Sequence, residues 1–200
     1  MYIIVEGMPS SGKTTLAKKI SDYYGMHYFK SLLSNDAYGN AVRTFRDKSS
    51  NEEVVDMLHL IDLMRNEMQI SDLLKEINVV RDKCFVSSLA HFECVKDDMG
   101  ENIQKIIRST YNEIFDKMIK PDLVIFINRN VEECRALSKD KDDKSAIDSI
   151  ILDNVLRFNK QSSALLENAN KYFGDRLLIV EGQSDLNIVF QKINDCVKWR

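Results

Sequence analysis

The stretch IIVEGMPSSGKTTLAKKI, residues 3–20, constrains the fold of this chain more than any other part of its sequence. Residues 7–14 fit the pattern GxxxxGK[ST], with a β-branched apolar run before them and an amphipathic helical pattern after them. The two glycines let the backbone curl, so that successive N–H groups point at a phosphate at the positive end of the helix dipole. The stretch predicts a strand, a phosphate-binding loop and a helix in direct succession.

The side chains of this loop have separate expected tasks. Lys13 supplies a mobile positive charge between the β- and γ-phosphates of ATP, and the hydroxyl of Thr14 ligates Mg²⁺. The expected ATP-binding residues are Gly7, Ser10, Ser11, Gly12, Lys13, Thr14 and Thr15. The NKxD motif of GTPases is absent, and helicase modules generally need a longer chain. A small-molecule kinase, whose lid closes over ATP and excludes water, is therefore favoured.

Apolar runs that alternate with helical patterns predict the fold class. After the first strand, the expected strands are the runs 79–85, 123–127 and 177–180. Apolar residues at helical spacing predict long helices over 54–70 and 103–118, and Pro121 separates the second helix from the next strand. Such alternation predicts an α/β fold in which a parallel β-sheet has helices on both faces. Only two prolines occur and neither belongs to a linker, so we expect one domain over residues 1–200.

Composition narrows the classes of partner. The net charge is −3, so the chain lacks a broad basic field, and a DNA substrate is not favoured. The four cysteines are widely spaced and form no CxxC pair, which favours free thiols over a disulfide framework or a zinc site. No stretch has the length of a membrane span and no leader pattern precedes the first strand. We therefore expect a cytoplasmic protein without membrane contact.

Four segments together resemble the thymidylate kinases and their deoxynucleoside kinase relatives. They are VEGMPSSGKTT at 5–15, VVRDKCFVSSLAHFE at 79–93, KPDLVIFINRNVEECRAL at 120–137 and RLLIVEGQSDLNIVFQKI at 176–193. They occur in the order of the family, and the likeness is weakest over 30–51. The resemblance implies a P-loop kinase fold with a short lid, the cofactors ATP and Mg²⁺, and a small nucleotide or nucleoside as substrate. It also implies a homodimer, although core burial alone would explain the apolar helix 54–70.

By resemblance, Asp82 and Lys83 fall on the DR of the family's DRY motif, with Asp82 at the carboxyl end of the family's third strand and beside the phosphate loop. Asp82 either orders the Mg²⁺ shell or takes the acceptor proton, and a structural Asp in a turn is the simpler alternative. Lys83 replaces an arginine that contacts the acceptor phosphate. A lysine cannot form the two parallel hydrogen bonds that an arginine makes to a phosphate, and it offers a single point charge instead.

The resemblance also indicates an acceptor pocket. Arg65 falls where the family reads the thymine edge, unless it only belongs to the solvated face of its helix. Ser87 and Ser88 either line the pocket or cap the following helix. Ile61 stands where a stacking ring is usual, so Phe92 or Tyr38 would have to stack on the base instead. His91 and Phe92 stand where the family has Tyr-Gln, and a lone His is more often packed or exposed than catalytic.

Two departures concern the acceptor and the lid. The motif TREPGG, whose arginine binds the acceptor 5′-phosphate, is absent, and only Lys30 or Arg43 could replace that arginine. Pro9 also stands where an acid or amide is frequent in the family.

The lid is expected over about 135–148. The phosphate loop has no arginine, and in family members of that kind the lid supplies the cation that stabilises the transition state. The candidates are Arg135 together with Lys139, Lys141 or Lys144.

Three functions remain open at this stage. The first is transfer of the γ-phosphoryl group of ATP to a deoxypyrimidine nucleoside monophosphate such as dTMP, which needs no general base. The second is a kinase of a hydroxyl acceptor, either a deoxynucleoside or a 5-hydroxymethyl pyrimidine in DNA, with Asp82 as the base. The third is a non-catalytic nucleotide-binding module, which the intact Gly-Lys-Thr sequence disfavours.

The expected site residues fall into three groups. The expected catalytic residues are Lys13, Asp82, Arg135 and Lys139. The expected substrate-binding residues are Arg65, Lys83, Ser87 and Phe92, and the expected metal ligands are Thr14 and Asp82.

Overall fold

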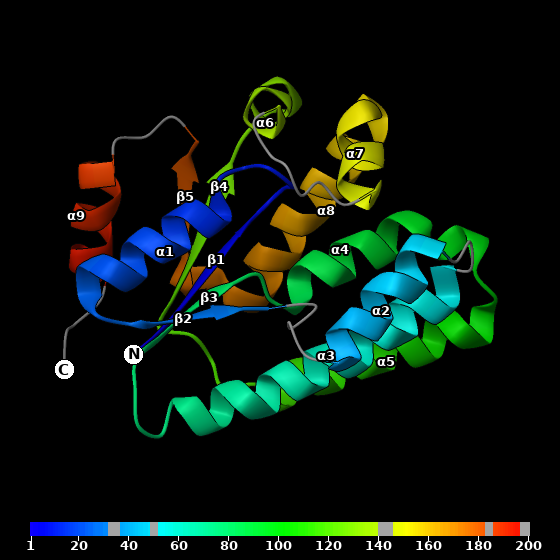
Figure 1. The fold of residues 1–200 in the computed structure, drawn as a ribbon, viewed down its shortest axis with the longest axis horizontal. Helices are drawn as coiled ribbons and strands as arrows, with labels where there is room; N and C mark the ends of the chain where they lie inside the picture. The colour runs from blue at the N-terminus through cyan, green and yellow to red at the C-terminus, as the bar shows by residue number, and fades with distance from the viewer. Residues whose placement is uncertain (32–36, 49–51, 140–145, 183–185, 197–200) are drawn as a thin grey trace.

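A parallel sheet forms the centre of the molecule (Figure 1). The computed structural model describes residues 1–31, 37–48, 52–139, 146–182 and 186–196. Within these ranges the sheet has five strands in the order β2-β3-β1-β4-β5, and every neighbouring pair is parallel. The strands are β1 (Tyr2–Gly7), β2 (His27–Lys30), β3 (Val79–Asp82), β4 (Leu123–Asn128) and β5 (Leu177–Glu181). The predicted parallel sheet is confirmed.

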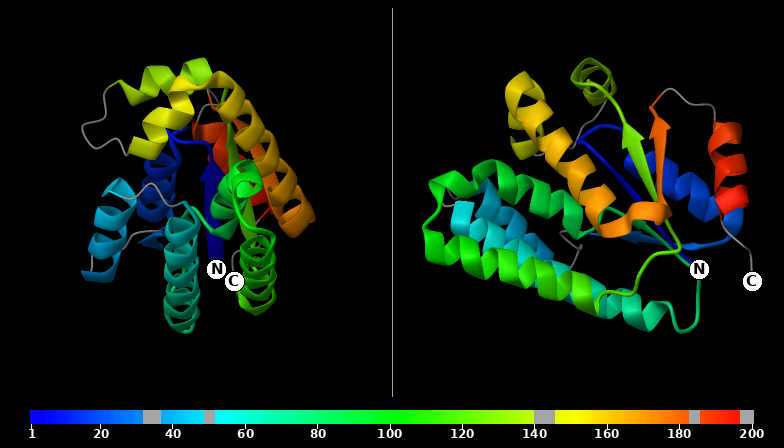
Figure 2. Two further views of the ribbon diagram at one scale, coloured as in Figure 1. Left: turned by 90° about the vertical axis from the view of Figure 1, so that its right-hand side faces the viewer. Right: turned by 180° about the vertical axis from the view of Figure 1, so that it is seen from behind.

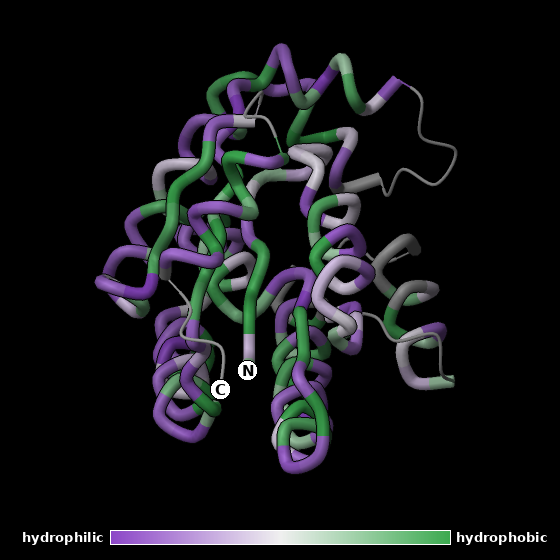
Figure 3. The backbone as a smooth tube through the Cα atoms, turned by 90° about the vertical axis from the view of Figure 1, so that its left-hand side faces the viewer, coloured by the Kyte–Doolittle hydropathy of each residue, from purple (hydrophilic) through white to green (hydrophobic). Residues whose placement is uncertain are grey.

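Helices cover both faces of this sheet, as expected. The helices are α1 (Lys13–Tyr24), α2 (Ala37–Lys48), α3 (Glu52–Leu73), α4 (Phe85–Val95), α5 (Glu101–Lys117), α6 (Val131–Ser138), α7 (Ala146–Asp153), α8 (Val155–Phe173) and α9 (Leu186–Cys196), with short 3₁₀ turns at Lys96–Asp98 and Gly174–Arg176. Helices α1 and α9 pack on one face of the sheet, and α4 and α8 pack together on the other (Figure 1). In Figure 3 the central strands are mostly hydrophobic, and the helices around them alternate between hydrophobic and hydrophilic positions.

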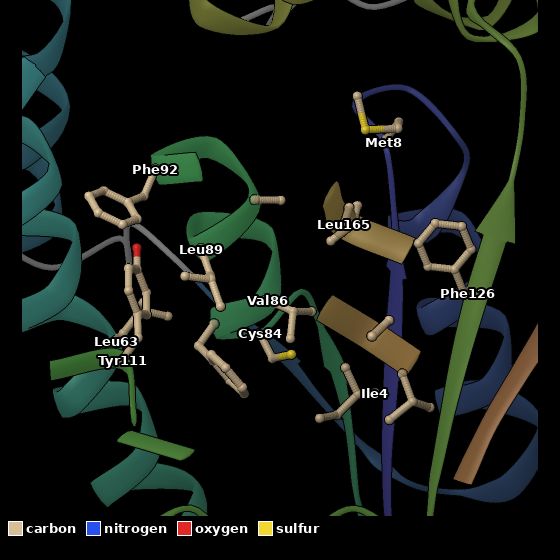
Figure 4. Packing of buried hydrophobic residues seen from close by; sticks show 14 of the residues in the cluster. Ile4, Met8, Leu63, Cys84, Val86, Leu89, Phe92, Tyr111, Phe126 and Leu165 are labelled. Carbon is tan, nitrogen blue, oxygen red and sulfur yellow. The ribbon is translucent and has the colours of Figure 1, made fainter. Parts of the chain in front are cut away.

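Strand β1 holds the two halves of the core together. All six of its residues are buried, because β3 and β4 flank it in the plane of the sheet and helices cover both faces. Ile3 and Val5 point into the core beneath α1 and α9, whereas Tyr2 and Ile4 point into the larger core beneath α4 and α8 (Figure 4). The phosphate loop therefore begins at the end of a central strand that is buried along its whole length.

Helices α3 and α5 run side by side beyond the edge of the sheet (Figure 2). Their bounds contain the helices predicted over 54–70 and most of 103–118, so both predictions are confirmed. Helix α5 ends at Lys117, and Pro121 lies in the connection to β4. Within the described ranges, no helix is long and apolar enough to cross a membrane. Cys84, Cys94 and Cys134 are free thiols, while the Cys196 side chain lies outside the described residues.

Two local predictions were wrong. The run 79–85 is not one strand, because β3 ends at Asp82 and Phe85 begins α4, where its ring is fully buried against Phe115 and Tyr172. Strand β2 was missed, since it is a short edge strand in which only the central residues are partly buried and no apolar run marks it.

Candidate functional site

The phosphate loop lies where β1 ends and α1 begins, and its backbone requires both glycines. Gly7 has φ +147°, and a Cβ there would lie 2.7 Å from the carbonyl oxygen of Ile127 on β4. Gly12 has φ +96° and is the N-cap of α1, where no side chain caps the first N–H groups. Ser10 is also left-handed, with φ 59°. The N–H groups at the start of α1 are thus available to an anion, as the motif predicts.

Lys13 is buried inside this loop. Its Nζ donates a hydrogen bond to the carbonyl oxygen of Met8 at 2.6 Å. Burial and then repulsion by Lys83 lower the pKa of Lys13 to about 8, although Asp82, Glu6 and Asp148 oppose this shift. Burial of an ammonium that donates its hydrogen bond to a backbone carbonyl is costly. Its position on the loop matches the expected contact with ATP, and that role remains a prediction.

Asp82 ends β3 directly beside the loop. Its Oδ2 accepts hydrogen bonds from the Thr14 hydroxyl at 2.5 Å and from the Tyr28 hydroxyl at 3.2 Å. Its Oδ1 is buried and has no hydrogen-bond partner among the described residues. Mg²⁺ in kinases is usually held by one or two protein oxygens together with phosphate oxygens and water. Thr14 and Asp82 therefore fit Mg²⁺, which would neutralise phosphate charge when bound.

The turn between β3 and α4 is built around Lys83. Its φ is 71°, a left-handed conformation that is unusual for a residue with a Cβ, and its N–H donates to the carbonyl oxygen of Val5 at 3.0 Å. The next N–H, that of Cys84, donates to Oε1 of Glu6 at 2.6 Å. This turn brings the Lys83 ammonium close enough to Lys13 to affect its pKa. Two lysines thus share the carboxyl edge of β1 and β3.

The predicted acceptor residues lie on α3 and α4. The Arg65 guanidinium is partly exposed, lies 3.7 Å from the Asp62 carboxylate and stacks over the Tyr38 ring at 4.7 Å, so it is not simply solvated. The Ser87 hydroxyl donates to Oε2 of Glu6 at 2.6 Å. Both Ser87 and Ser88 lie inside α4, whose N-cap is Cys84, so the capping alternative was wrong.

Phe92 and His91, two residues that the resemblance places near the acceptor pocket, lie largely in the interior. The Phe92 ring has no exposed surface and packs near Tyr111 in the core (Figure 4), so its placement does not favour stacking on a substrate. His91 is mostly buried, with Nε2 3.9 Å from the Asp56 carboxylate. A charged Asp56 would favour the imidazolium form, but burial and then the Arg157 charge lower the pKa of His91 to about 4. The ring is therefore neutral at pH 7, and Tyr38, which is partly buried, is the remaining candidate for stacking on the base.

The described parts of the expected lid are α6 and α7, and Figure 1 shows α6 above β4 and α7 above α8. Arg135 joins these two helices, because its Nε donates to the carbonyl oxygen of Leu152 at 2.7 Å. Lys139 is exposed at the end of α6. Lys141 and Lys144 lie outside the described residues, as does the side chain of Arg43. The catalytic role of this segment remains a prediction.

Four residues of this region were missed by the sequence reasoning. Glu6 and Tyr28 contact the turn and Asp82, as described above. Arg81, fully buried in β3, pairs with Glu67 at 2.5 Å and fixes α3 against the sheet. Arg129 follows β4, and its Nε donates to the carbonyl oxygen of Ser11 at 3.0 Å. Arg81 and Glu6 carried a signal, since each is a charged residue in an otherwise apolar strand and therefore requires a buried partner.

The fold and the loop geometry define the class of the protein: it is a P-loop kinase of nucleosides or nucleotides. The sequence model of the family described as "Deoxynucleoside kinase" matches residues 3–198, so the chain belongs to the deoxynucleoside kinase family. It is an ATP-dependent kinase, as expected from the sequence.

Individual proteins give the same result. The chain is 22% identical over 200 residues to the thymidylate kinase of Blochmanniella floridana, covering 94% of this chain and 90% of that protein. It is 26% identical over 176 residues to the probable thymidylate kinase of Picrophilus torridus, covering 86% and 79%.

Solved structures share the fold at lower identity. The deoxyadenosine kinase of M. mycoides with dCMP and a flexible dCDP bound has a TM-score of 0.76 at 16% identity, covering 98% of this chain and all of that one. The thymidylate kinase of Candida albicans has a TM-score of 0.70 at 17% identity, covering 97% and 89%. These likenesses establish the fold alone, and both kinds of kinase occur among them.

Proposed function

We propose that the protein transfers the γ-phosphoryl group of ATP to the phosphate of a deoxypyrimidine nucleoside monophosphate such as dTMP. One observation carries this choice of acceptor. Lys30, the last residue of β2, is paired in register with Asp82, and Lys83 follows Asp82 directly. Together with Lys13, two further cations thus gather at the carboxyl edge of three neighbouring strands. An acceptor that carries a phosphate would neutralise this charge.

The chemistry needs positioning more than acid–base catalysis. An acceptor phosphate oxygen is already anionic, so no proton has to be removed before transfer. The N–H groups of the loop and Lys13 bind the donor phosphates, and Thr14 with Asp82 holds Mg²⁺. Asp82 accepts a hydrogen bond from Thr14, which supports a role as a metal partner. Arg65 and Tyr38 would contact the base edge and face, by similarity to the thymidylate kinases.

A hydroxyl acceptor is the second candidate. The buried Oδ1 of Asp82 has no hydrogen-bond partner within the described part of the chain, so it could accept the proton of a 5′-hydroxyl. The match to the deoxynucleoside kinase family supports this alternative as well. Non-catalytic nucleotide binding is not proposed, because the chain belongs to a family of kinases.

An assay of ADP release separates the two acceptors. Purified protein is incubated with Mg-ATP and, in turn, dTMP, dUMP, 5-hydroxymethyl-dUMP, the other deoxynucleoside monophosphates, the free deoxynucleosides, and DNA that contains hydroxymethyl pyrimidines. We expect turnover confined to monophosphates, with deoxypyrimidines preferred. Turnover only with free nucleosides or with DNA would overturn the proposal and assign Asp82 as the base.

Two structural parts of the proposal concern the lid and the assembly. We propose that the lid spans about 135–148. Its described helix α7 lies near enough to the loop that the Asp148 carboxylate partly opposes the lowering of the Lys13 pKa. The apolar surface of α3 supports a homodimer, because Met68 is 71% exposed beside a groove of about 430 Å³ between α3 and α5. Analytical ultracentrifugation at micromolar concentration should give the mass of two chains, and Met68→Lys should give the mass of one. A monomeric wild type would overturn the dimer.

A further inference from the structure

Tyr28, on the edge strand β2, has a side chain that reaches the metal side of the site. Its hydroxyl donates a hydrogen bond to Oδ2 of Asp82 at 3.2 Å, and the Thr14 hydroxyl donates to the same oxygen at 2.5 Å. Tyr28 lies in register with Val80, and both side chains contribute to the core beneath α1. Since side chains alternate along a strand, Asp82 points to this same face. Three oxygens from β2, β3 and α1 thus meet beside the phosphate loop.

The backbone and the ring of Tyr28 are both held in place. The N–H groups of His27 and Ser31 donate to carbonyl oxygens just before β3 and at its end, at 2.8 and 3.1 Å, so both ends of β2 are attached to β3. The Tyr28 ring is half-buried and packs against the core beneath α1. The Lys18 ammonium of α1 lies over this ring, 5.8 Å from its centroid. These contacts give the hydroxyl a defined position.

Both hydroxyl groups bind the same oxygen of Asp82. The other oxygen, Oδ1, is buried and has no hydrogen-bond partner among the described residues. An anionic oxygen in these surroundings is costly unless a cation or a water molecule approaches it. Each hydroxyl has one proton, so donation to Oδ2 leaves the lone pairs of Thr14 available as well. Oδ1 of Asp82 and Oγ1 of Thr14 are hard oxygen ligands of the kind that Mg²⁺ prefers.

We infer that Tyr28 is a positioning residue for Mg²⁺, which acts by holding Asp82 so that its Oδ1 faces the cation. This inference rests on the proposed function in one respect, namely that Thr14 and Asp82 hold the metal. Within the described part of the chain, Thr14 and Tyr28 are the donors to this carboxylate. Without the Tyr28 hydroxyl only Thr14 remains, so the carboxylate can turn and Oδ1 loses its direction.

Binding of Mn²⁺ to the complex with ADP tests this inference without turnover. Mn²⁺ is a paramagnetic ion that favours the same oxygen ligands as Mg²⁺, so electron paramagnetic resonance gives its Kd. Matched titrations of ADP alone correct for metal bound by free nucleotide. We expect Tyr28→Phe, which removes one oxygen and keeps the ring, to raise this Kd about 10-fold, as is typical when a partner of a metal ligand is lost. Calorimetry should show an unchanged Kd for ADP without metal.

A second variant and a control make the result specific. Asp82→Asn should raise the Mn²⁺ Kd at least as much as Tyr28→Phe does. The double variant should bind Mn²⁺ no more weakly than Asp82→Asn, because Tyr28 acts only through Asp82. Tyr24→Phe is the matched control and should keep the wild-type Kd, since it removes a hydroxyl that donates to Asn194 at the opposite end of α1 from Thr14. Phenylalanine retains the packing of the Tyr28 ring, so the fold is kept, which thermal melting verifies.

The outcomes are distinct. An unchanged Mn²⁺ Kd in Tyr28→Phe together with a raised Kd in Asp82→Asn overturns the inference and leaves the proposed metal ligand in place. Unchanged values in both variants overturn the metal assignment and the inference with it. A raised acceptor KM in Tyr28→Phe at saturating Mg²⁺, with normal metal binding, makes Tyr28 a substrate contact and also overturns the inference. Metal binding is measured without an acceptor, so the choice between monophosphate and hydroxyl acceptors is decided separately by ADP release.

Discussion

The donor side and the acceptor side of this site are built in different ways. The groups expected to bind the donor come from one continuous segment, 7–15, whose backbone makes the contacts. The groups expected to bind the acceptor are side chains from β2, β3, α3 and α4, which lie up to about sixty residues apart in sequence. A backbone site at a helix end depends on few residue identities, whereas a side-chain site changes with each substitution. The donor motif can therefore stay intact while the acceptor motifs diverge.

The largest effect on activity is expected from a substitution on the donor side. Lys13→Ala should lower kcat/KM roughly 10³-fold, because a cation that stabilises the transferring phosphoryl group is lost. The free energy of unfolding should not fall, since the substitution removes a buried charge. Coupled ADP-release kinetics and urea unfolding measure the two quantities. Lys19→Ala, an exposed lysine of the same helix, should retain full activity. Equal activity of both variants would contradict the assignment of the loop.

Asp82→Asn tests the residue that the two sides share. We expect a loss of roughly 10²-fold in kcat, together with a higher Mg²⁺ concentration for half-maximal rate, because a neutral amide is a poorer ligand. Activity measured against Mg²⁺ concentration gives both values. Asp122→Asn is the control, because that carboxylate accepts from the N–H of Tyr2 at the opposite end of β1. A lower rate with unchanged Mg²⁺ dependence would indicate a base instead of a metal ligand.

Two substitutions of Lys83 test acceptor binding and stability separately. Lys83→Gly and Lys83→Ala should both raise the acceptor KM about 10-fold, because each removes the same charge. The glycine variant should be more stable than the alanine variant by about 1 kcal/mol, since glycine adopts φ 71° without steric strain. Kinetics and chemical denaturation measure these differences. Equal stability of the two variants would mean that the turn relaxes, and equal acceptor KM for wild type and variants would exclude Lys83 from the acceptor side.

The last expected effect is on stability alone and concerns His91, a mostly buried residue of α4. The pKa of His91 is about 4 in the folded chain, below the roughly 6.5 of an unfolded chain, so the unfolded chain binds a proton first as the pH falls. Stability from the neutral ring is fully present above about pH 6.5 and is lost as the pH falls towards 4. Between pH 7 and 5 the loss should be about 2 kcal/mol. Urea unfolding at several pH values should show that the free energy of unfolding falls more steeply with falling pH in wild type than in His91→Gln. Parallel plots of this free energy against pH would contradict the prediction.

The sequence predicted the strand, loop and helix of the donor side well because the information there is local. Gly7, Gly12 and Lys13 stand at fixed spacing, and the flanking periodicities indicate the strand and the helix. The contacts of Glu6 were not predictable, because its partners Cys84 and Ser87 are 78 and 81 residues away. Strand β2 was missed for a related reason: HYFK becomes a strand only because β3 supplies its hydrogen-bond partners. The burial of Phe92 was not predictable either, since a ring next to a motif has the same letter whether it faces a pocket or the core.

The central place of β1 has a consequence for synthesis of the chain. Tyr2 pairs with Val79, and Ile3 pairs with Leu123, so β1 leaves the ribosome well before both of the strands that flank it. At roughly 5–20 residues per second, about 120 residues take some 6–24 s to appear. During that time an apolar strand is exposed without a partner, a state prone to aggregation that chaperones can shield. Asp82 also emerges long after Thr14, so bound nucleotide can assist only the late steps of folding.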